Sequence, residues 1–205
     1  TAYRRTIKKL LRKYDREHIV LNMGSGPTYF NERRDLINVD FHPYEEVDIV
    51  ADITDLPVAD GTIDFIINIA VLEHVEQVHM AVREMFRILK PGGEVLCYVP
   101  FIVPFHGAPQ DFHRWTMLGM EKLFANYEIL ETGIGCGPTS GLLWIFQEWT
   151  AILFSFGSKK LHDVILLFLL IVLMPLKVID IILARFPHAE KIASGFYIVA
   201  SKKEG

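Results

Sequence analysis

Five short, almost continuously apolar segments divide residues 19–99, and each ends in a polar residue or a glycine. They are residues 19–23, 36–39, 47–51, 63–69 and 94–99. A strand that is apolar on both faces is typical of a parallel sheet whose two faces are covered by helices. Apolar side chains at helical spacing separate the fourth and fifth segments, over residues 75–89. The alternation predicts an α/β fold built on a doubly wound sheet.

Two later segments bring the expected strands to seven. Residues 127–132 and 195–201 alternate as strands do, and residues 116–125 have a helical pattern. Lys90-Pro91-Gly92-Gly93 should stop the preceding helix and turn the chain into the fifth strand. Residues 41–46 are too few for a crossover helix, so we expect a loop there.

Composition excludes some classes of function. The chain has 205 residues and a net charge of −4, so no global basic field argues for a nucleic-acid partner. Cys97 and Cys136 lack zinc-ligand spacing, and an unlinked pair suits an intracellular compartment. Residues 1–18 are basic without a following apolar stretch, so we expect no signal peptide. The expected location is cytoplasmic.

The first eighteen residues have the pattern of a basic amphipathic helix. Tyr3, Ile7, Leu10, Leu11 and Tyr14 share one face, and lysine and arginine cover the other. One interpretation is a solvated helix that packs on the domain. The other is attraction to anionic lipid. The segment alone favours packing.

A glycine turn follows the first strand. Gly24-Ser25-Gly26 would leave backbone N–H groups and open space beside a ligand. The third glycine of a dinucleotide fingerprint falls at Tyr29, which counts against NAD or FAD. Asp40 and Asp52 end the second and third strands. Each acid alone is best explained as a cap, but the three features together would line one edge of the sheet, where open α/β sheets bind ligands.

These residues resemble the ordered motifs of class I S-adenosylmethionine-dependent methyltransferases, of the kind called methyltransferase type 11. The matching segments are residues 21–26, 37–40, 52–64, 71–75 and 87–93. The resemblance implies a Rossmann-like seven-stranded sheet of order 3-2-1-4-5-7-6 with strand 7 antiparallel. It also implies S-adenosylmethionine as the cofactor and methyl transfer as the activity.

Carried over position by position, the resemblance implies a cofactor site. Gly24, Ser25 and Gly26 would lie along the methionine part, and Asp40 would hold the ribose with Phe41 beside the adenine. Asp52 and Ile53 would contact the adenine, while Asn68 and Ala70 would lie near the sulfonium. Some quinone-pathway relatives carry an extra metal-associated acid at the position of Ala70. Glu73 and His74 alone do not make a convincing site, so we predict no metal.

The loop after the fifth strand, residues 104–116, combines histidines, an acid, an arginine, aromatics and prolines. Such a loop at the carboxyl end of a strand suits an acceptor pocket. The candidates for catalysis are His106, Asp111 and His113, and those for substrate binding are Arg114 and Trp115. The alternative is that the histidines brace the loop and that Asp111 and Arg114 form a structural pair. The loop more loosely resembles that of methyltransferases encoded with bacterial surface-polysaccharide and glycolipid genes.

An apolar insertion of about sixty residues, 134–194, separates the sixth and seventh strands, far longer than a usual connection. Residues 164–176 carry no charge, which is short of the ~20 residues that span a bilayer. Pro175 should kink or end the helix. We therefore expect mostly helical structure and favour a hairpin that dips into one leaflet through residues 141–185. A helical cover for the sheet, or a homodimer interface through the same surface, is the alternative.

The sequence therefore predicts three parts: a basic helix over 1–18, a methyltransferase domain over 19–133 with 195–205, and the insertion. The expected function is methyl transfer to a lipid-linked or membrane-resident acceptor, for example a glycan hydroxyl, at the inner face of the cytoplasmic membrane. The alternative is a non-catalytic membrane- or partner-binding module on a methyltransferase scaffold.

Overall fold

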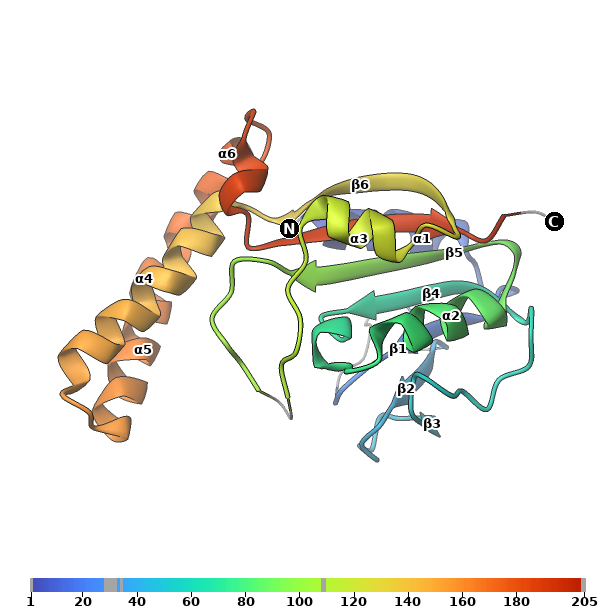
Figure 1. Cartoon of the computed structure of the whole chain (residues 1–205), viewed down its shortest axis with the longest axis horizontal. Helices are drawn as coiled ribbons and strands as arrows, with labels where there is room; N and C mark the ends of the chain where they lie inside the picture. Colours follow the sequence, from blue (N-terminus) through green and yellow to red (C-terminus); the bar gives the residue numbers. More distant parts are fainter. Residues whose placement is uncertain (1, 28–32, 34, 108–109, 204–205) are drawn as a thin grey trace.

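A computed structural model describes residues 2–27, 33, 35–107 and 110–203 of the chain. Figure 1 shows a sheet with helices on both faces and a two-helix arm that projects beyond one end of the sheet. Tyr29, which counts against a dinucleotide cofactor, lies outside the described residues. The strands are β1 (Val20–Met23), β2 (Ile37–Asp40), β3 (Ile49–Val50), β4 (Ile63–Ile69), β5 (Leu89–Pro100), β6 (Glu128–Cys136) and β7 (Gly195–Ser201).

The sheet has the order β3-β2-β1-β4-β5-β7-β6, which confirms the expected topology. Strands β1 to β5 pair in parallel, and β7 lies antiparallel between β5 and β6. Every strand except β7 therefore runs in the same direction. The carboxyl ends of those strands share one edge of the sheet, and the two-helix arm leaves from that edge (Figure 1).

Several strand boundaries differ from the sequence prediction. The segment 47–51 yields only the two-residue β3, and the segment 127–132 is shifted into the longer β6. β5 begins at Leu89, before the predicted 94–99, because Leu89 pairs with Ile63 while Glu94 pairs with Phe65. The register between β4 and β5 shifts over residues 90–93, inside a strand that already pairs at Leu89. Gly92 has a φ of 75° in this stretch.

The helices cover both faces of the sheet. They are α1 (Ala2–Lys13), α2 (Val78–Ile88) and α3 (Met117–Leu123), with the 3₁₀ turn η1 (Leu72–His74) before α2. The predicted helix 75–89 begins three residues late because η1 ends in extended backbone at Val75, φ −104° and ψ 116°. α3 lies within the predicted 116–125, where Thr116 Oγ1 accepts the N–H of Gly119 at 3.1 Å.

The apolar face of α1 packs on the sheet. Tyr3 stacks on Tyr98 with ring centroids 4.5 Å apart, and Tyr14 stacks on Phe65 at 5.0 Å. Ile7 is buried in the same cluster. The interpretation of a helix packed on the domain is confirmed, and this apolar face cannot also enter lipid.

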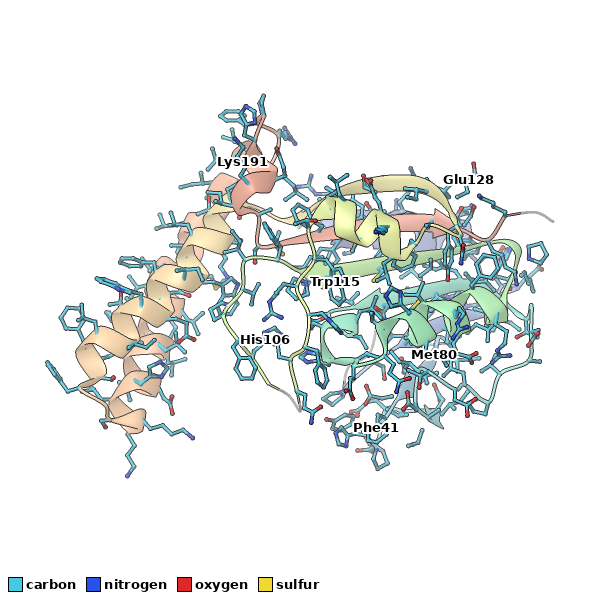
Figure 2. The ribbon with its side chains drawn as sticks, viewed as in Figure 1. Phe41, Met80, His106, Trp115, Glu128 and Lys191 are labelled. Carbon is cyan, nitrogen blue, oxygen red and sulfur yellow. The ribbon has the colours of Figure 1, made fainter. Side chains whose placement is uncertain are left out.

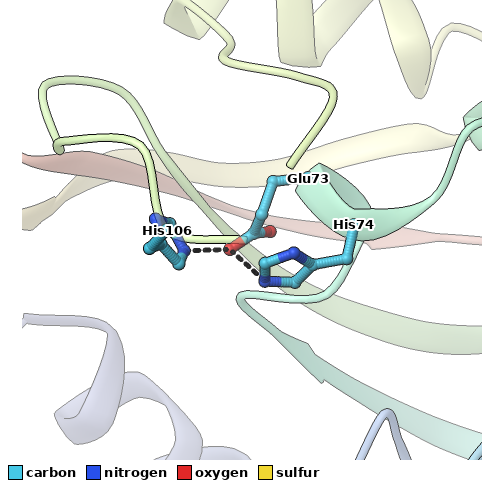
Figure 3. Close-up of side chains that lie close together, drawn as sticks. All are labelled: Glu73, His74 and His106. Atoms are coloured by element: carbon cyan, nitrogen blue, oxygen red, sulfur yellow. Dashed lines mark ion pairs between the residues drawn. The ribbon is translucent and has the colours of Figure 1, made fainter. Parts of the chain in front are cut away.

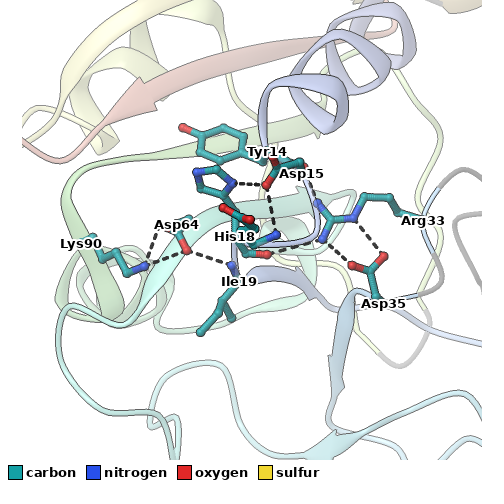
Figure 4. Close-up of polar contacts among 9 residues, drawn as sticks. Tyr14, Asp15, His18, Ile19, Arg33, Asp35, Asp64 and Lys90 are labelled. Atoms are coloured by element: carbon teal, nitrogen blue, oxygen red, sulfur yellow. Dashed lines mark hydrogen bonds and ion pairs between the residues drawn. The ribbon is translucent and has the colours of Figure 1, made fainter.

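The chain between α1 and β1 is fastened to the amino end of the sheet (Figure 4). Asp64 accepts the N–H of Ile19 at 2.8 Å and two hydrogen bonds from Lys90 Nζ at 2.7 and 2.8 Å. Arg33 donates to the Tyr14 carbonyl and pairs with Asp35 at 2.7 Å. These contacts fix the direction in which β1 enters the sheet.

We expect Asp64→Ala to lower the free energy of unfolding by about 1–3 kcal/mol, since the Ile19 N–H and the Lys90 ammonium both lose a charged acceptor whose side chain is 13% exposed. Urea denaturation measures the change. Asp60→Ala removes a carboxylate whose side chain is 79% exposed, so it should cost no more than about 0.5 kcal/mol. Equal losses for the two variants would contradict the anchoring role of Asp64.

The insertion is a helical hairpin followed by short turns. α4 (Pro138–Ser155) and α5 (Lys159–Leu173) run side by side, and η2 (Met174–Ile179), α6 (Asp180–Leu183) and η3 (Ala189–Ile192) return the chain to β7. α5 ends just before Pro175, as predicted. By length and composition alone, the stretch Lys159–Leu183 could cross a membrane. None of its most apolar part is buried inside the protein.

The base of the hairpin is tied by Asp180. Its carboxylate accepts the N–H groups of Thr139 at 2.7 Å and Ser140 at 2.9 Å, and the Ser140 hydroxyl at 2.7 Å. An acid at a helix N-terminus also opposes the helix dipole favourably. Asp180 therefore holds the start of α4 against α6, beside the sheet.

Candidate functional site

A cavity of about 530 Å³ opens at the carboxyl edge of the parallel strands. Its lining includes most of the predicted cofactor residues: Gly24, Gly26, Asp40, Phe41, Asp52, Ile53 and Ala70. A volume of this size suits a small-molecule ligand. Figure 2 shows Phe41 on the β2 side of this edge and His106 on the loop that follows β5.

The glycine turn combines a left-handed backbone conformation with open space beside the cavity. Gly24 and Gly26 have φ of 72° and 55°, the left-handed region that favours glycine. The N–H groups of Gly24 and Ser25 donate to the Val39 carbonyl at 2.8 and 3.1 Å, rather than pointing at a ligand as the sequence suggested. A Cβ at Gly26 would meet no atom within 4 Å, so the turn leaves open space at the cavity.

Asp40 links the glycine turn to the end of β2. Its Oδ2 accepts the N–H of Gly26 at 2.8 Å, and its Oδ1 accepts the N–H of His42 at 2.9 Å. An ionised carboxylate offers about four lone-pair sites, so each oxygen keeps capacity for one more donor. Two such sites, held in a fixed orientation at the cavity wall, suit a ribose diol.

The residues that the resemblance assigns to the adenine line this cavity. Phe41 and Tyr44 present exposed rings to the cavity, and Ile53 supplies an apolar wall. Asp52 also acts as the turn cap that was its alternative interpretation, since its Oδ1 accepts the N–H and the hydroxyl of Thr54 at 2.8 and 2.7 Å. Tyr44 was not anticipated from the sequence.

Two predicted cofactor residues do not line the cavity. Ser25 is buried, and Asn68 is wholly buried at the centre of the sheet. The Asn68 amide donates to the Met23 carbonyl at 3.3 Å, and Cys97 Sγ lies 3.4 Å from its oxygen, so it braces three neighbouring strands. Ala70 does line the cavity and has φ 55°, a strained value that a rim residue can hold only with support.

Within the loop after β5, Asp111 and Arg114 form the structural pair that was the alternative interpretation. The Asp111 side chain is 1% exposed and is bound by both terminal nitrogens of Arg114 and by the N–H of His106 at 2.9 Å. The Arg114 guanidinium holds the pKa of Asp111 well below its usual range, although burial opposes the shift. Asp111 therefore helps to orient the loop, and its catalytic role stays a prediction.

His113 and Trp115 also serve the loop. His113 Nε2 lies 3.4 Å from the Glu76 carbonyl, and its ring is 5.1 Å from that of Trp115. Trp115 packs against the core under α3. Gln110 and Phe112, which sequence reasoning missed, are the loop residues that face the cavity.

The loop brings His106 to Glu73 and His74, a cluster that the sequence did not assemble (Figure 3). The Nε2 atoms of both histidines lie 3.8 Å from Glu73 Oε1, and their rings are perpendicular with centroids 5.2 Å apart. Burial raises the pKa of Glu73 to about 7. The backbone carbonyl of Glu73 accepts the N–H of Phe112 at 2.7 Å, which fastens the loop to η1.

We expect Gly24→Ala to destabilise the protein by about 1–3 kcal/mol and to weaken cofactor binding. A Cβ at Gly24 would overlap the Val71 methyl groups in addition to the strain of positive φ, and Val71 lines the cavity. Gly26→Ala carries the strain without an overlap. Urea denaturation of both variants checks this. If Gly24→Ala is as stable as Gly26→Ala, the close approach to Val71 has no energetic importance.

Comparison with known proteins agrees with the site. Residues 28–97 match the family described as a methyltransferase domain. A protein of Mycolicibacterium smegmatis named a probable S-adenosylmethionine-dependent methyltransferase is 36% identical over 63 residues, which is 30% of this chain. The matched segment covers only 24% of that protein's length.

Solved structures of low sequence identity share the fold. Phosphoethanolamine N-methyltransferase 2 of Haemonchus contortus, in complex with S-adenosyl-L-methionine, matches 97% of this chain and 52% of its own with a TM-score of 0.58 at 13% identity. The cyclase SpnF matches 98% of this chain and 81% of its own, also at 0.58 and at 15% identity. Because one of the two is named a cyclase, the fold by itself does not decide the reaction.

The cavity, the motif order and the matched segment agree on S-adenosylmethionine as the cofactor. The chain has the fold of class I S-adenosylmethionine-dependent methyltransferases, with their methyltransferase domain matched over residues 28–97.

Proposed function

We propose that this chain transfers a methyl group from S-adenosylmethionine to a hydroxyl of a membrane-resident acceptor. The observation that carries the proposal is the cavity at the carboxyl edge, where Gly24, Gly26, Asp40 and Asp52 meet beside the loop after β5. When bound, S-adenosylmethionine supplies an activated methyl group on a sulfonium.

The protein's contribution is alignment. Asp40 and the glycine turn would fix S-adenosylmethionine, and the loop after β5, fastened to Glu73, would position the acceptor. Holding two reactants in line supplies much of the rate in such a reaction. The sulfur–methyl bond breaks as the oxygen–methyl bond forms, and the acceptor loses its proton.

A bilayer as the partner of the hairpin is supported by an inverted distribution of side chains. The α4 residues buried in the hairpin are mostly small or polar and include Gln147, Ala151 and Ser155. Gln147 is 1% exposed and donates to the Leu169 carbonyl on α5 at 3.3 Å. Small residues and polar contacts between helices are typical of helix pairs in membranes.

The outer surface of the hairpin is mostly apolar, although the Asp163 side chain is 61% exposed near the tip. Its exposed large side chains are Leu142, Ile145, Phe146, Trp149, Ile152, Leu153, Phe154, Phe156, Leu161, Val164, Leu167, Phe168, Ile171 and Val172. A hairpin in water would place such side chains between its helices and polar ones outside. The arrangement here is the reverse, and it favours lipid over water as the surroundings.

Charges mark the two ends of the apolar surface. Lys159 and Lys160 lie at the tip, and Lys177 and Asp180 at the base, where the Lys177 ammonium is 5.1 Å from the Trp144 ring centroid. Between them Glu148 pairs with His162 at 3.2 Å. Lysines at the ends of an apolar segment can reach the polar interface of a bilayer.

Because the hairpin and the cavity share one edge of the sheet, an inserted hairpin would bring the site close to the membrane surface. This favours a lipid-linked acceptor, such as a glycan hydroxyl, and a location at the inner face of the cytoplasmic membrane. Incubation with methyl-tritiated S-adenosylmethionine and a total lipid extract should move label into the organic phase, and Asp40→Ala should not. Label found only in water-soluble products would contradict a lipid-linked acceptor.

A non-catalytic binding module on the same scaffold is the second candidate, since the exposed apolar surface of the hairpin does not depend on the cavity. It predicts membrane binding through the hairpin without any methyl transfer. Label transferred from S-adenosylmethionine to any lipid component excludes it.

A further inference from the structure

Glu73 has a buried carboxyl group whose oxygens accept no hydrogen bond from the residues that the structure describes. It is 0% exposed, and neither carboxylate oxygen has a hydrogen-bond partner within the described part of the chain. A buried carboxylate without a partner is unfavourable unless a cation or a hydrogen-bond donor joins it. The side chain is aimed at the two histidines beside the cavity (Figure 3).

The contacts of both histidines allow a lone pair on Nε2, the nitrogen that faces Glu73. His74 Nδ1 contacts the Gln110 carbonyl, which only accepts, so Nδ1 holds the proton and Nε2 a lone pair. His106 Nδ1 lies 3.1 Å from the Pro104 carbonyl and 3.5 Å from Asp111 Oδ2. A terminal nitrogen of Arg114 also lies 3.4 Å from this Nδ1, so these contacts alone do not fix the tautomer of His106. A metal ion on Nε2 requires the proton on Nδ1, where the Pro104 carbonyl can accept it. Such second contacts are how proteins orient metal-binding histidines.

Three acceptor atoms therefore converge. Glu73 Oε1 is 3.8 Å from each Nε2, and the three atoms lie within 4.8 Å of one another. We propose that Glu73, His74 and His106 bind one divalent transition-metal ion of the zinc type. One cation at this point satisfies all three atoms, whereas one proton joins only two of them.

The ligands indicate which metal. Imidazole nitrogens with one carboxylate suit zinc, cobalt or iron, while magnesium and calcium prefer sets of oxygen ligands. In a tetrahedral zinc site the ligand atoms are about 3.3 Å apart. Each Glu73–histidine separation of 3.8 Å would have to shorten by about half an ångström, and the two Nε2 atoms, which lie within 4.8 Å of each other, by up to about 1.5 Å. Three protein ligands leave a position open, as catalytic zinc sites do.

The metal site adds to the proposed function a way to activate the acceptor hydroxyl. Metal binding itself does not depend on that function, and only the chemical role of the metal rests on it. His74 lines the cavity, so an acceptor hydroxyl placed there can occupy the open position. A divalent cation lowers the pKa of that hydroxyl. The proton passes to water, and the oxygen takes the methyl group as the sulfur–methyl bond breaks. His106 is then a ligand rather than a general base, and the prediction of a metal-free site is replaced.

Cobalt(II) is the probe, because its visible absorption reports on coordination. The full chain should bind one equivalent with the bands of a four- or five-coordinate ion. Glu73→Gln and His106→Ala should each weaken binding at least about a hundredfold, as expected when a ligand is lost. His79→Ala, which removes an exposed histidine of α2, should leave binding unchanged.

Titration with S-adenosylhomocysteine separates this proposal from the function. Glu73→Gln should bind S-adenosylhomocysteine as the unmodified chain does, which also shows that the variant is folded. Cobalt that binds Glu73→Gln and His106→Ala as tightly as the unmodified chain overturns the metal site. If the unmodified chain does not bind S-adenosylhomocysteine, the proposed function is overturned. The cobalt titration then still decides whether the metal site exists.

Discussion

Asp40→Ala should weaken the binding of S-adenosylhomocysteine by about a hundredfold or more. The carboxylate already orients Gly26 through a 2.8 Å hydrogen bond and keeps acceptor capacity toward the cavity. Charge-assisted hydrogen bonds contribute about 1.5–3 kcal/mol each, so the loss of two from a ribose diol exceeds about 3 kcal/mol. Every 1.4 kcal/mol is about tenfold in affinity. Isothermal titration measures the change.

Two further variants make the Asp40 result specific. Asp40→Asn keeps an acceptor for the Gly26 N–H but loses the charge, so its affinity should lie between those of the unmodified chain and Asp40→Ala. Asp60→Ala removes an exposed acid from a different surface and should bind normally. An Asp40→Ala protein that binds within about threefold of the unmodified chain would show that this carboxylate does not hold the cofactor.

Phe168→Asp combined with Ile171→Asp should abolish flotation of the protein with vesicles of phosphatidylethanolamine and phosphatidylglycerol. Both side chains are on the outer surface of α5, 62% and 66% exposed, so the substitutions leave the hairpin packing intact. An aspartate at the centre of a membrane helix costs about 2.5–3.5 kcal/mol. Two of them cost about 6 kcal/mol, enough to keep the hairpin in water.

The control is Leu118→Asp on α3, which removes a 76% exposed apolar side chain outside the hairpin and should float normally. Size-exclusion chromatography with light scattering decides between lipid and a second copy of the chain. A protein that never floats but forms a dimer that Phe168→Asp with Ile171→Asp dissociates would assign the surface to self-association and contradict the membrane proposal.

The strands of the sheet were predictable because they depend on local patterns, whereas their order was implied only by the resemblance to class I methyltransferases. The short apolar segments predicted seven strands, and the order 3-2-1-4-5-7-6 is confirmed. Boundaries were less predictable where a tertiary contact decides them. The early start of β5 depends on the pairing of Leu89 with Ile63, and the late start of α2 depends on the separate turn at η1.

The candidate site, like the fold, was only partly predictable from the sequence. Gly24, Asp40 and Asp52 lie at strand ends, so their sequence positions already predict that they share an edge. The role of Asn68 was not visible, because strand alternation does not say whether a polar side chain faces a cavity or a neighbouring strand. His106 joins Glu73 only through the path of a loop that has no periodicity, so no pattern in the sequence brings the two together.

A crystal structure of the protein grown with S-adenosylhomocysteine tests the central claim most directly. The ligand should occupy the cavity with its ribose hydroxyls on the Asp40 carboxylate, its adenine between Phe41 and Ile53, and its sulfur toward Ala70 and the Glu73 cluster. An empty cavity at saturating ligand, or a ligand bound anywhere else on the chain, would contradict the assignment of this site to S-adenosylmethionine.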